Sequence, residues 1–361
     1  MRRIRLRKLA GRFCSSTQYW MNVFKVFPQR SSYFRIVSAN FLRGLVKTAG
    51  GVMLSKRAHN QLLSQRKKAV SELVILEGAE LEQGIVGVVF SKDRALQLYT
   101  LLSTYFEHVK NPASLFIIYT ASTDSHAKAY AEIETALHGC PVEVLFVREG
   151  VSFRDGLLHV LGKIRVKNIF FLVDDIVFIR PMSLDVASRL NPLNTILSFR
   201  HGPHLCRSYT ADVNQMPPNF FRSQSGSDLL EFKWFEQGNE WSDPWSLDGQ
   251  VLSTAEVRVL TRLSDFKAPN TYESALKTFN DIAEGRMGMC YSKSKILNLP
   301  INRVQSEVLN LSGTISPEYL LDQWNKGMML DTSMLEDHVP RSPHEELAIS
   351  FKKRRPFAFS C

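Results

Sequence analysis

The sequence lacks several features that define common protein classes. Its five cysteines are scattered and form neither a CxxC pair nor a cluster with histidines, which argues against a zinc site or a disulfide framework and favours a reducing compartment. No GxGxxG follows the first predicted strand, and no GxxxxGK followed by Ser or Thr occurs, so a dinucleotide fingerprint and a Walker loop are both absent. A nucleotide would therefore have to bind through other side chains.

Residues 1–71 lack acidic side chains altogether. This arm holds 16 Lys or Arg and carries +16, whereas the remaining 29 basic and 35 acidic residues give the body −6, which accounts for the total of +10. No stretch of the arm has the roughly 18 uncharged apolar residues that a spanning helix needs. No compact apolar segment follows its charged start either, so we expect neither a membrane span nor a cleaved secretory signal.

The basic residues of the arm are interleaved with aromatic and leucine residues. This pattern suits adsorption at an anionic membrane surface, at about 1 kcal/mol per basic residue close to the surface. A solvated tail, a nucleic-acid-binding segment and an organellar transit peptide are the alternatives. We expect a cytoplasmic protein held peripherally at the inner face of a membrane, with nucleic acid the less favoured partner.

Composition divides the chain into three parts. The basic arm and a linker helix, predicted at 54–70, occupy 1–83; a folded domain occupies 84–330; and a polar C-terminal tail occupies 331–361. Within the domain, 84–200 is predicted as the half that binds a nucleotide sugar and a metal, and 201–330 as the acceptor half.

From Gly84 onward, strands and helices alternate. Apolar runs predict strands at 85–90, 115–119, 142–147 and from 169, and periodic segments between them predict helices at 96–106, 125–137 and 153–163. This order favours an α/β fold with a mostly parallel sheet and helices on both faces. Ligands bind such sheets at the carboxyl ends of the strands.

Polar clusters follow three of these strands. They are the segments 91–94 (Ser-Lys-Asp-Arg), 122–124 (Ser-Thr-Asp) and 174–175 (Asp-Asp). Asp93 could accept a hydrogen bond from a base or ribose, Arg94 could pair with a phosphate, and Asp124 could hold the base. Arg94 could equally be a solvated residue at a helix start.

Asp174 and Asp175 end the most apolar strand of the chain. Two carboxylates at the end of a buried strand cost free energy through desolvation and mutual repulsion unless a positive charge meets them. Mg²⁺ or Mn²⁺ would meet that need, since these ions favour carboxylate oxygens together with substrate phosphates. The alternative is an aspartate pair that merely caps a loop.

The order of these motifs resembles the nucleotide-sugar-binding half of glycosyltransferases with the GT-A fold. The segment 120–124 (Thr-Ala-Ser-Thr-Asp) is similar to the Asp-Gly-Ser-Thr-Asp turn of family 2 enzymes, and Val173-Asp174-Asp175 stands where that fold carries its DxD metal motif. The resemblance covers about 84–200 well and about 245–310 loosely. Two departures are Thr120-Ala121 in place of Asp-Gly, and Val173 in place of the first acid.

The resemblance implies roles for the residues of these motifs. Asp175 would be the better metal ligand, with Asp174 on the ribose or the metal, and Mn²⁺ or Mg²⁺ would be the cofactor. Ser91, Asp93 and Arg94 would contact the nucleoside and phosphate of a nucleoside-diphosphate sugar.

Residues 201–246 lose periodicity and combine several prolines with several aromatic residues. A long irregular insertion is usually functional, and aromatic rings suit stacking on sugars, so we interpret this segment as the acceptor region. The alternative is a surface excursion whose rings pack onto the body.

Ser246 is predicted to be the N-cap of a helix that holds Asp248 in its first turn. An inverting sugar transfer needs a carboxylate that takes the proton of the acceptor hydroxyl. In the similar enzymes that base lies downstream of the metal motif, so Asp248 is the candidate, with Asp243 second. Capping electrostatics alone also explain an acid in a first helical turn. Residues 269–273 are predicted as a polar turn followed by a helix to Glu284.

The sequence thus predicts a metal-dependent glycosyltransferase of the hexosyltransferase type, with inversion favoured. It would transfer a sugar from a nucleoside-diphosphate sugar to a hydroxyl of a saccharide or lipid-linked acceptor, in cell-surface polysaccharide or glycolipid synthesis. The alternatives are a nucleotidyltransferase, which would be expected to carry a glycine-rich basic loop after its first strand, and a non-catalytic membrane- or nucleic-acid-binding protein on a degenerate transferase fold.

Overall fold

The computed structural model describes residues 56–150, 152–302 and 313–357. The chain forms two units, Met1–Leu76 and Glu77–Cys361. The first unit holds most of helix α3 (Lys56–Gly78), which confirms the predicted basic linker helix and extends it by two turns. Most of the basic arm lies outside the described residues.

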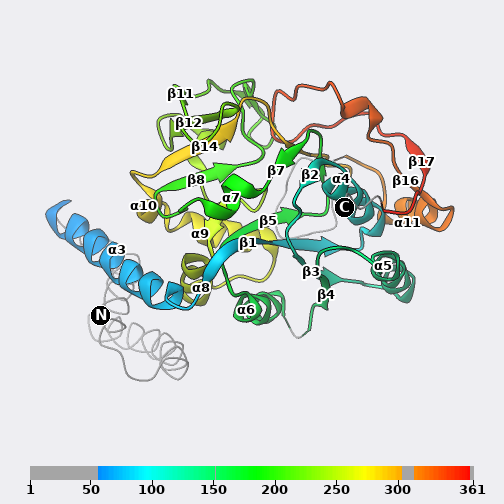
Figure 1. The fold of residues 1–361 in the computed structure, drawn as a ribbon, viewed down its shortest axis with the longest axis horizontal. Coiled ribbons are helices and arrows are strands. Elements are labelled where there is room, and N and C mark those ends of the chain that lie inside the picture. The colour runs from blue at the N-terminus through cyan, green and yellow to red at the C-terminus, as the bar shows by residue number, and fades with distance from the viewer. Residues whose placement is uncertain (1–55, 151, 303–312, 358–361) are drawn as a thin grey trace, which may run out of the picture. The chain divides into compact units, whose positions relative to one another are not determined.

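A five-stranded sheet forms the centre of the second unit (Figure 1). Its strand order is β13-β5-β1-β3-β4, and all of its neighbouring pairs are parallel except β13 with β5. The strands are β1 (Glu82–Lys92), β3 (Leu115–Thr120), β4 (Val144–Arg148), β5 (Val166–Val173) and β13 (Val251–Ser253). This arrangement confirms the predicted α/β fold with a mostly parallel sheet.

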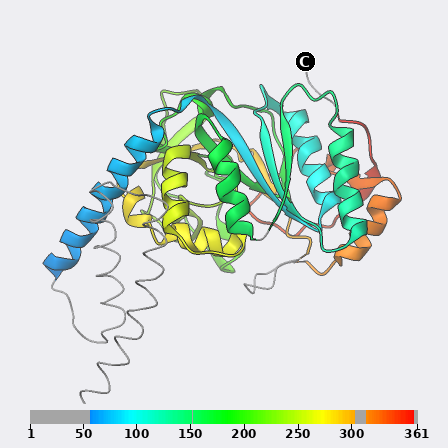
Figure 2. The same ribbon diagram turned by 90° about the horizontal axis from the view of Figure 1, so that it is seen from below.

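Helices cover both faces of this sheet (Figure 2). One face carries α4 (Ala95–His108), α5 (Asp124–Ala136) and α11 (Pro317–Asn325), and the other carries α6 (Phe153–Lys163) and α8 (Thr254–Leu263). The starts of α5 and α6 are set by the Thr123 and Ser152 side chains, which accept hydrogen bonds from the backbone N–H groups of His126 and Asp155. The central strands β1 and β5 are buried on both faces, as their continuous apolar sequences require.

A second, mixed sheet stands beside the first, in the order β11-β12-β14-β8. Only β14 and β8 are parallel within it. Its strands are β8 (Thr195–Ser198), β11 (Phe221–Arg222), β12 (Leu229–Lys233) and β14 (Met287–Tyr291). The remaining short elements are β2 (Val109–Lys110), β6 (Ile176–Phe178), β7 (Met182–Ser183), α7 (Asp185–Arg189), β9 (Arg207–Ser208), β10 (Val213–Asn214), η1 (Asn239–Ser242), β15 (Ile296–Asn298) and η2 (Ser333–Leu335).

The aromatic residues of segment 201–246 mostly fill the protein interior. Phe232, Trp241 and Trp245 are fully buried, and the rings of Phe232 and Trp241 lie 5.2 Å apart in an edge-on contact. The expectation that these rings stack on a sugar is therefore wrong for the buried ones, because packing against the mixed sheet removes their faces from solvent. Tyr209 is an exception and lines the cleft described below.

The segment from Asp331 is part of the folded body rather than a free polar tail. Strand β17 (Phe351–Lys353) pairs with β16 (Met328–Leu330), and the Phe357 ring lies 4.5 Å from that of Tyr99 in the core. The sequence did not predict this packing, because 331–361 are mostly polar and contain few apolar residues.

The predicted helix start at Ser246 is wrong. Residues 246–250 form a turn, β13 pairs with β5, and α8 begins only after Ser253, whose side chain accepts from the backbone N–H of Glu256. The turn depends on Gly249, whose φ of +81° lies in the left-handed region that a helix cannot use.

The polar turn predicted at 269–273 is the first turn of helix α9 (Pro269–Lys277), with Pro269 at a position that tolerates its missing N–H. A separate short helix, α10 (Asn280–Ala283), follows, so the predicted helix to Glu284 is broken at 278–279.

Gly249→Ala should destabilise the protein by about 2–5 kcal/mol, because a Cβ there would combine a positive φ with a contact of 2.5 Å to Ile296 Cδ1. Gly139→Ala is the matched control, since Gly139 also has a positive φ but its Cβ would meet no atom within 4 Å, and it should cost only about 1–2 kcal/mol. Urea unfolding measures both, and equal losses would contradict the steric part of the explanation.

Candidate functional site

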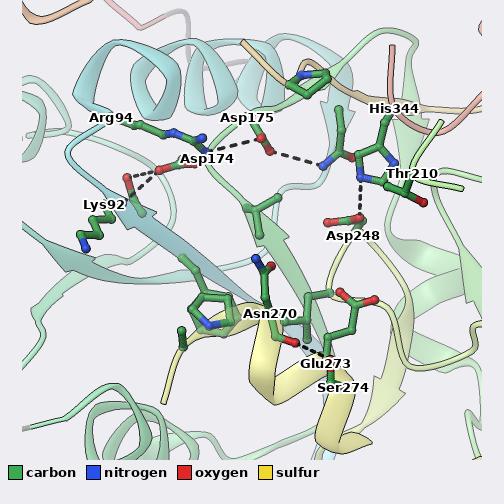
Figure 3. Close-up of a pocket in the computed structure, with 18 of the residues that line it drawn as sticks. Lys92, Arg94, Asp174, Asp175, Thr210, Asp248, Asn270, Glu273, Ser274 and His344 are labelled. Atoms are coloured by element: carbon green, nitrogen blue, oxygen red, sulfur yellow. Dashed lines mark hydrogen bonds and ion pairs between the residues drawn. The ribbon is translucent and has the colours of Figure 1, made fainter. Parts of the chain in front are cut away.

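A cleft of about 480 Å³ opens at the carboxyl ends of the parallel strands. Figure 3 shows residues from distant parts of the chain that face one another across it. Five of the predicted site residues line the cleft: Ser91, Arg94, Asp174, Asp175 and Asp248. The structure thus brings together side chains that are up to 157 residues apart in the sequence (91 and 248).

Asp174 is held by donors on both of its carboxylate oxygens. Oδ2 accepts from Ser91 Oγ at 2.8 Å and from the backbone N–H of Lys92 at 3.1 Å, and Oδ1 accepts from Arg94 Nη1 at 2.8 Å. These contacts tie the end of β5 to the turn after β1. Protein groups therefore occupy three of the roughly four acceptor positions of the Asp174 carboxylate.

Arg94 supplies the positive charge that the two aspartates require. Its Nη1 lies 2.8 Å from Asp174 and 3.4 Å from Asp175, and its Nη2 donates to the carbonyl oxygen of Asn302. Burial lowers the pKa of Arg94, but the charges of Asp174 and Asp175 more than offset that effect and raise it. The guanidinium is thus fixed between the carboxylates (Figure 3).

Asp175 is the freer member of the pair. Besides Arg94, only the Asn298 side-chain amide donates to it among the described residues, at 3.3 Å. Burial, aided by the nearby negative charges of Asp174 and Asp248, raises the pKa of Asp175 to about 6.

This donor set offers a metal ion a partial site. Asp175 fits as a ligand because its oxygens have only long protein contacts, and the buried side-chain oxygen of Asn298 has no hydrogen-bond partner. Asp174 fits less well, because three donors already occupy its oxygens and leave one acceptor position, on Oδ1. In the described part of the chain, no group of three or more His, Cys, Asp or Glu side chains is placed to hold a metal ion.

Asp248 lies near Asp175, because the Asn298 side-chain amide that donates to Asp175 also acts on Asp248. Its Oδ2 is 3.0 Å from Arg200 Nη1 and 3.4 Å from His344 Nε2. Burial raises the pKa of Asp248, but the hydrogen bond and charge of His344 and the charge of Arg200 lower it further, to about 2. Asp248 is therefore ionised at neutral pH.

Further charged residues surround Asp248. Buried Arg200 also pairs with Glu240 at 3.1 Å, and Lys277 bridges Asp243 at 3.0 Å and Glu273 at 2.9 Å. Burial and the charge of Asp243 raise the pKa of Glu273 to about 8. This end of the cleft is thus polar and rich in carboxylates.

Two predicted site residues do not line the cleft. Asp93 has a φ of +54°, and its carboxylate accepts from the backbone N–H and the hydroxyl of Ser122 at 2.7 and 2.6 Å, so it joins the β1 and β3 turns to each other. Asp124 is exposed in the first turn of α5. Their predicted roles in nucleotide binding have no support from their positions.

Several cleft residues were missed from the sequence, among them Lys92, Glu149 and His344. Lys92 and Glu149 follow strands in the same way as the residues that were predicted, so the strand-end rule could have found them. His344 had no such signal, because it reaches the cleft from the C-terminal segment, 96 positions after Asp248 (344 against 248).

Comparisons with known proteins give one similar curated sequence and a distant structural likeness. No family model matches this chain. The chain is 24% identical over 184 residues to the bifunctional glycosyltransferase pgtA of Dictyostelium discoideum. The match covers 46% of this chain and 23% of that protein, so the chain spans about a quarter of the length of this relative.

Among solved structures, 4-diphosphocytidyl-2C-methyl-D-erythritol synthase from Anaerococcus prevotii matches 68% of this chain and 99% of its own, with a TM-score of 0.33 and 10% identity. These values are too low to support an argument about family or activity. None of the described helices is both long enough and apolar enough to cross a bilayer.

Asp175→Asn and Asp248→Asn should change stability in opposite directions at pH 7. The raised pKa of Asp175 means that wild-type protein loses stability as the pH rises from about 4 to about 6, so the asparagine variant should be more stable above pH 6, by about 2 kcal/mol. The lowered pKa of Asp248 means that its ionised form stabilises the protein above pH 4, and that this stability is lost as the pH falls toward 2. Asp248→Asn removes the charge and should therefore lower the free energy of unfolding by about 2 kcal/mol at pH 7.

Unfolding in urea at pH 4, 5, 6 and 7 measures both differences. The gain from Asp175→Asn should shrink toward zero at pH 4. A gain that stays constant over this range would show that ionisation of Asp175 is not its cause.

Proposed function

We propose that this protein is a glycosyltransferase that moves a sugar from a nucleoside-diphosphate sugar to an acceptor hydroxyl. The observation that carries this proposal is the cleft at the carboxyl edge of the parallel sheet, which Asp175 lines from the turn after β5 and Asp248 from the turn before β13. The similarity to a protein named as a glycosyltransferase, over about half of this chain, supports the same reading.

The donor would lie along the ends of β1 and β5. Its diphosphate would sit near Asp175 and near the amine of Lys92, which lines the cleft and forms no ion pair among the described residues. Arg94 would act mainly by fixing the aspartates, because its guanidinium is already committed to them.

A divalent cation, Mn²⁺ or Mg²⁺, is part of the proposal, with Asp175 as its ligand from the protein. Such an ion would neutralise the charge that develops on the departing diphosphate. The Asn298 side-chain oxygen could add a second protein ligand, and the donor phosphates and water would supply the rest, since Ser91, Lys92 and Arg94 already engage Asp174.

Asp248 is the proposed base, which makes inversion the expected stereochemistry. It is ionised at neutral pH, lines the cleft and is held in place by Arg200 and His344. A carboxylate with so low a pKa accepts a proton weakly, so transfer of the hydroxyl proton should accompany departure of the diphosphate rather than precede it.

The acceptor would occupy the polar end of the cleft, near Tyr209, Asn270 and Glu273. Hydroxyl-rich saccharides suit this lining, because carboxylate, amide and phenol groups together can accept and donate hydrogen bonds. We propose a saccharide or lipid-linked acceptor of cell-surface polysaccharide or glycolipid synthesis.

Donor binding can be tested with a thermal-shift screen of nucleotide sugars, with and without Mn²⁺. A matching donor at a hundredfold excess over Kd should stabilise the protein by about 2.7 kcal/mol. Asp175→Ala should abolish the part of the shift that depends on Mn²⁺. Asp248→Asn should keep the donor shift but lower turnover by about 10²–10⁴-fold, since it removes the proposed base and leaves the donor contacts intact.

Glu143→Ala, on the exposed turn before β4 and away from the cleft, is the control and should behave as wild type. If no donor shifts the melting temperature under any metal condition, the proposed function is wrong.

We also propose that the basic arm, residues 1–71, holds the protein at an anionic membrane surface. Its +16 charge should make the full chain co-sediment with vesicles that contain about 30% phosphatidylserine, because each basic residue gains about 1 kcal/mol near an anionic surface. The full chain should not co-sediment with phosphatidylcholine vesicles. Binding should fall by more than tenfold in 0.5 M salt, because screening removes the attraction. Equal binding to both kinds of vesicle would contradict the proposal.

A further inference from the structure

The cleft has an apolar wall formed by a row of residues across the sheet. Phe90 on β1 is in register with Ile118 on β3 and with Val173 on β5, so their three side chains project from the same face. Phe153 at the start of α6 covers this row, with its ring 5.1 Å from that of Phe90. All four residues line the cleft, but Phe90, Ile118 and Phe153 are only 2–3% exposed, so the apolar surface open to a ligand is small and belongs mainly to Val173.

A carboxylate stands at the edge of this wall. Glu149 follows β4, and its backbone N–H donates to the carbonyl oxygen of Tyr119 at 2.8 Å. Its Oε2 accepts from the hydroxyl of Thr120 at 2.6 Å, which fixes the orientation of the side chain. Glu149 and Thr120 both line the cleft, and Thr120 follows Ile118 of the apolar row by two residues along β3.

The Glu149 carboxylate keeps most of its acceptor capacity. Among the described residues, the Thr120 hydroxyl is its one side-chain partner, and no ion pair reaches it. A carboxylate has about four acceptor positions, so the second oxygen and one position of the first stay available to a ligand. An oriented acceptor beside an apolar wall is suited to a flat ring that carries N–H groups on its edge.

We propose that Glu149 recognises the nucleobase of the donor by accepting hydrogen bonds from its ring N–H. This inference rests on the proposed function and names the class of nucleotide that the cleft takes. Guanine presents a ring N–H and an amino group side by side, which matches the two oxygens of a carboxylate; uracil presents one ring N–H. Adenine and cytosine place a ring nitrogen lone pair there, which a carboxylate repels.

The position of this pocket fits a nucleoside diphosphate. Val173 in the apolar wall and Asp175 at the proposed diphosphate site are two residues apart at the end of β5. Asp174 and Asp175 form the turn that directly follows Val173, so the two places are close together. A base on the wall therefore leaves the phosphates within reach of Asp175 and of Lys92, whose backbone pairs in register with Thr120.

Isothermal titration of the full-length protein with GDP, IDP, UDP, ADP and CDP, all with Mg²⁺, tests the proposal. GDP or UDP should bind at least tenfold more tightly than ADP and CDP. Glu149→Ala should weaken binding of the preferred nucleotide by about tenfold to a hundredfold, which is the usual effect of losing hydrogen bonds to a charged group, and leave ADP unchanged. GDP binding more tightly than IDP would assign the second oxygen to the amino group of guanine.

Two further variants separate recognition from folding. Glu149→Gln keeps an acceptor oxygen for Thr120 but gains a donor, so it should lose discrimination against CDP and ADP even if Glu149→Ala folds poorly. Glu143→Ala is exposed, lies just before β4 and should leave all five affinities unchanged.

The outcomes distinguish this inference from the proposed function. Nucleoside diphosphates that bind equally well whatever their base, with no effect of either Glu149 variant, would overturn the role of Glu149 and leave the transferase proposal standing. A protein that binds none of the five nucleotides would overturn both.

Discussion

The ion pairs of Arg94 with Asp174 and Asp175 are the contacts on which the rest of the cleft depends. Two carboxylates at the end of a buried strand are tolerable only with a compensating charge, and Arg94 provides it from the turn after the neighbouring strand. The same contacts fix the ends of β1 and β5 relative to each other. Asp174 accepts three hydrogen bonds from protein groups whereas Asp175 has only long contacts, so the two adjacent acids have different chemistry.

A second set of charges performs a similar task around Asp248. Arg200 is fully buried among Glu240, Asp243 and Asp248, and the C-terminal segment adds His344. Asp248 is therefore kept ionised by Arg200 and His344, which come from two separate parts of the chain. Because the surroundings differ, the pKa of Asp175 rises to about 6 while that of Asp248 falls to about 2 within one cleft. The arrangement gives the cleft one carboxylate that gains a proton easily and one that does not.

The path of the chain through the sheet explains why polar residues collect in this place. In parallel strands all carboxyl ends lie at one edge, so the turns after β1, β3, β4 and β5 meet there. Phe90, Ile118 and Val173 form part of the apolar wall at that edge because the strands pair in register. One face of three strands therefore supplies an apolar wall, and the turns just beyond it supply the charged groups.

The sequence by itself determined the α/β fold and five of the cleft residues. Apolar runs and helical periodicity are local patterns. They therefore predict β1, β3, β4 and β5 and the helices between these strands, including α6 with its Ser152 cap. Only the tertiary structure decided that Arg94 neutralises the aspartates, that Asp93 and Asp124 lie outside the cleft, and that His344 enters it from a segment expected to be a tail. The physical reason is that charge compensation and burial depend on distances between residues far apart in the chain, which strand pairing and packing set and which no local pattern records.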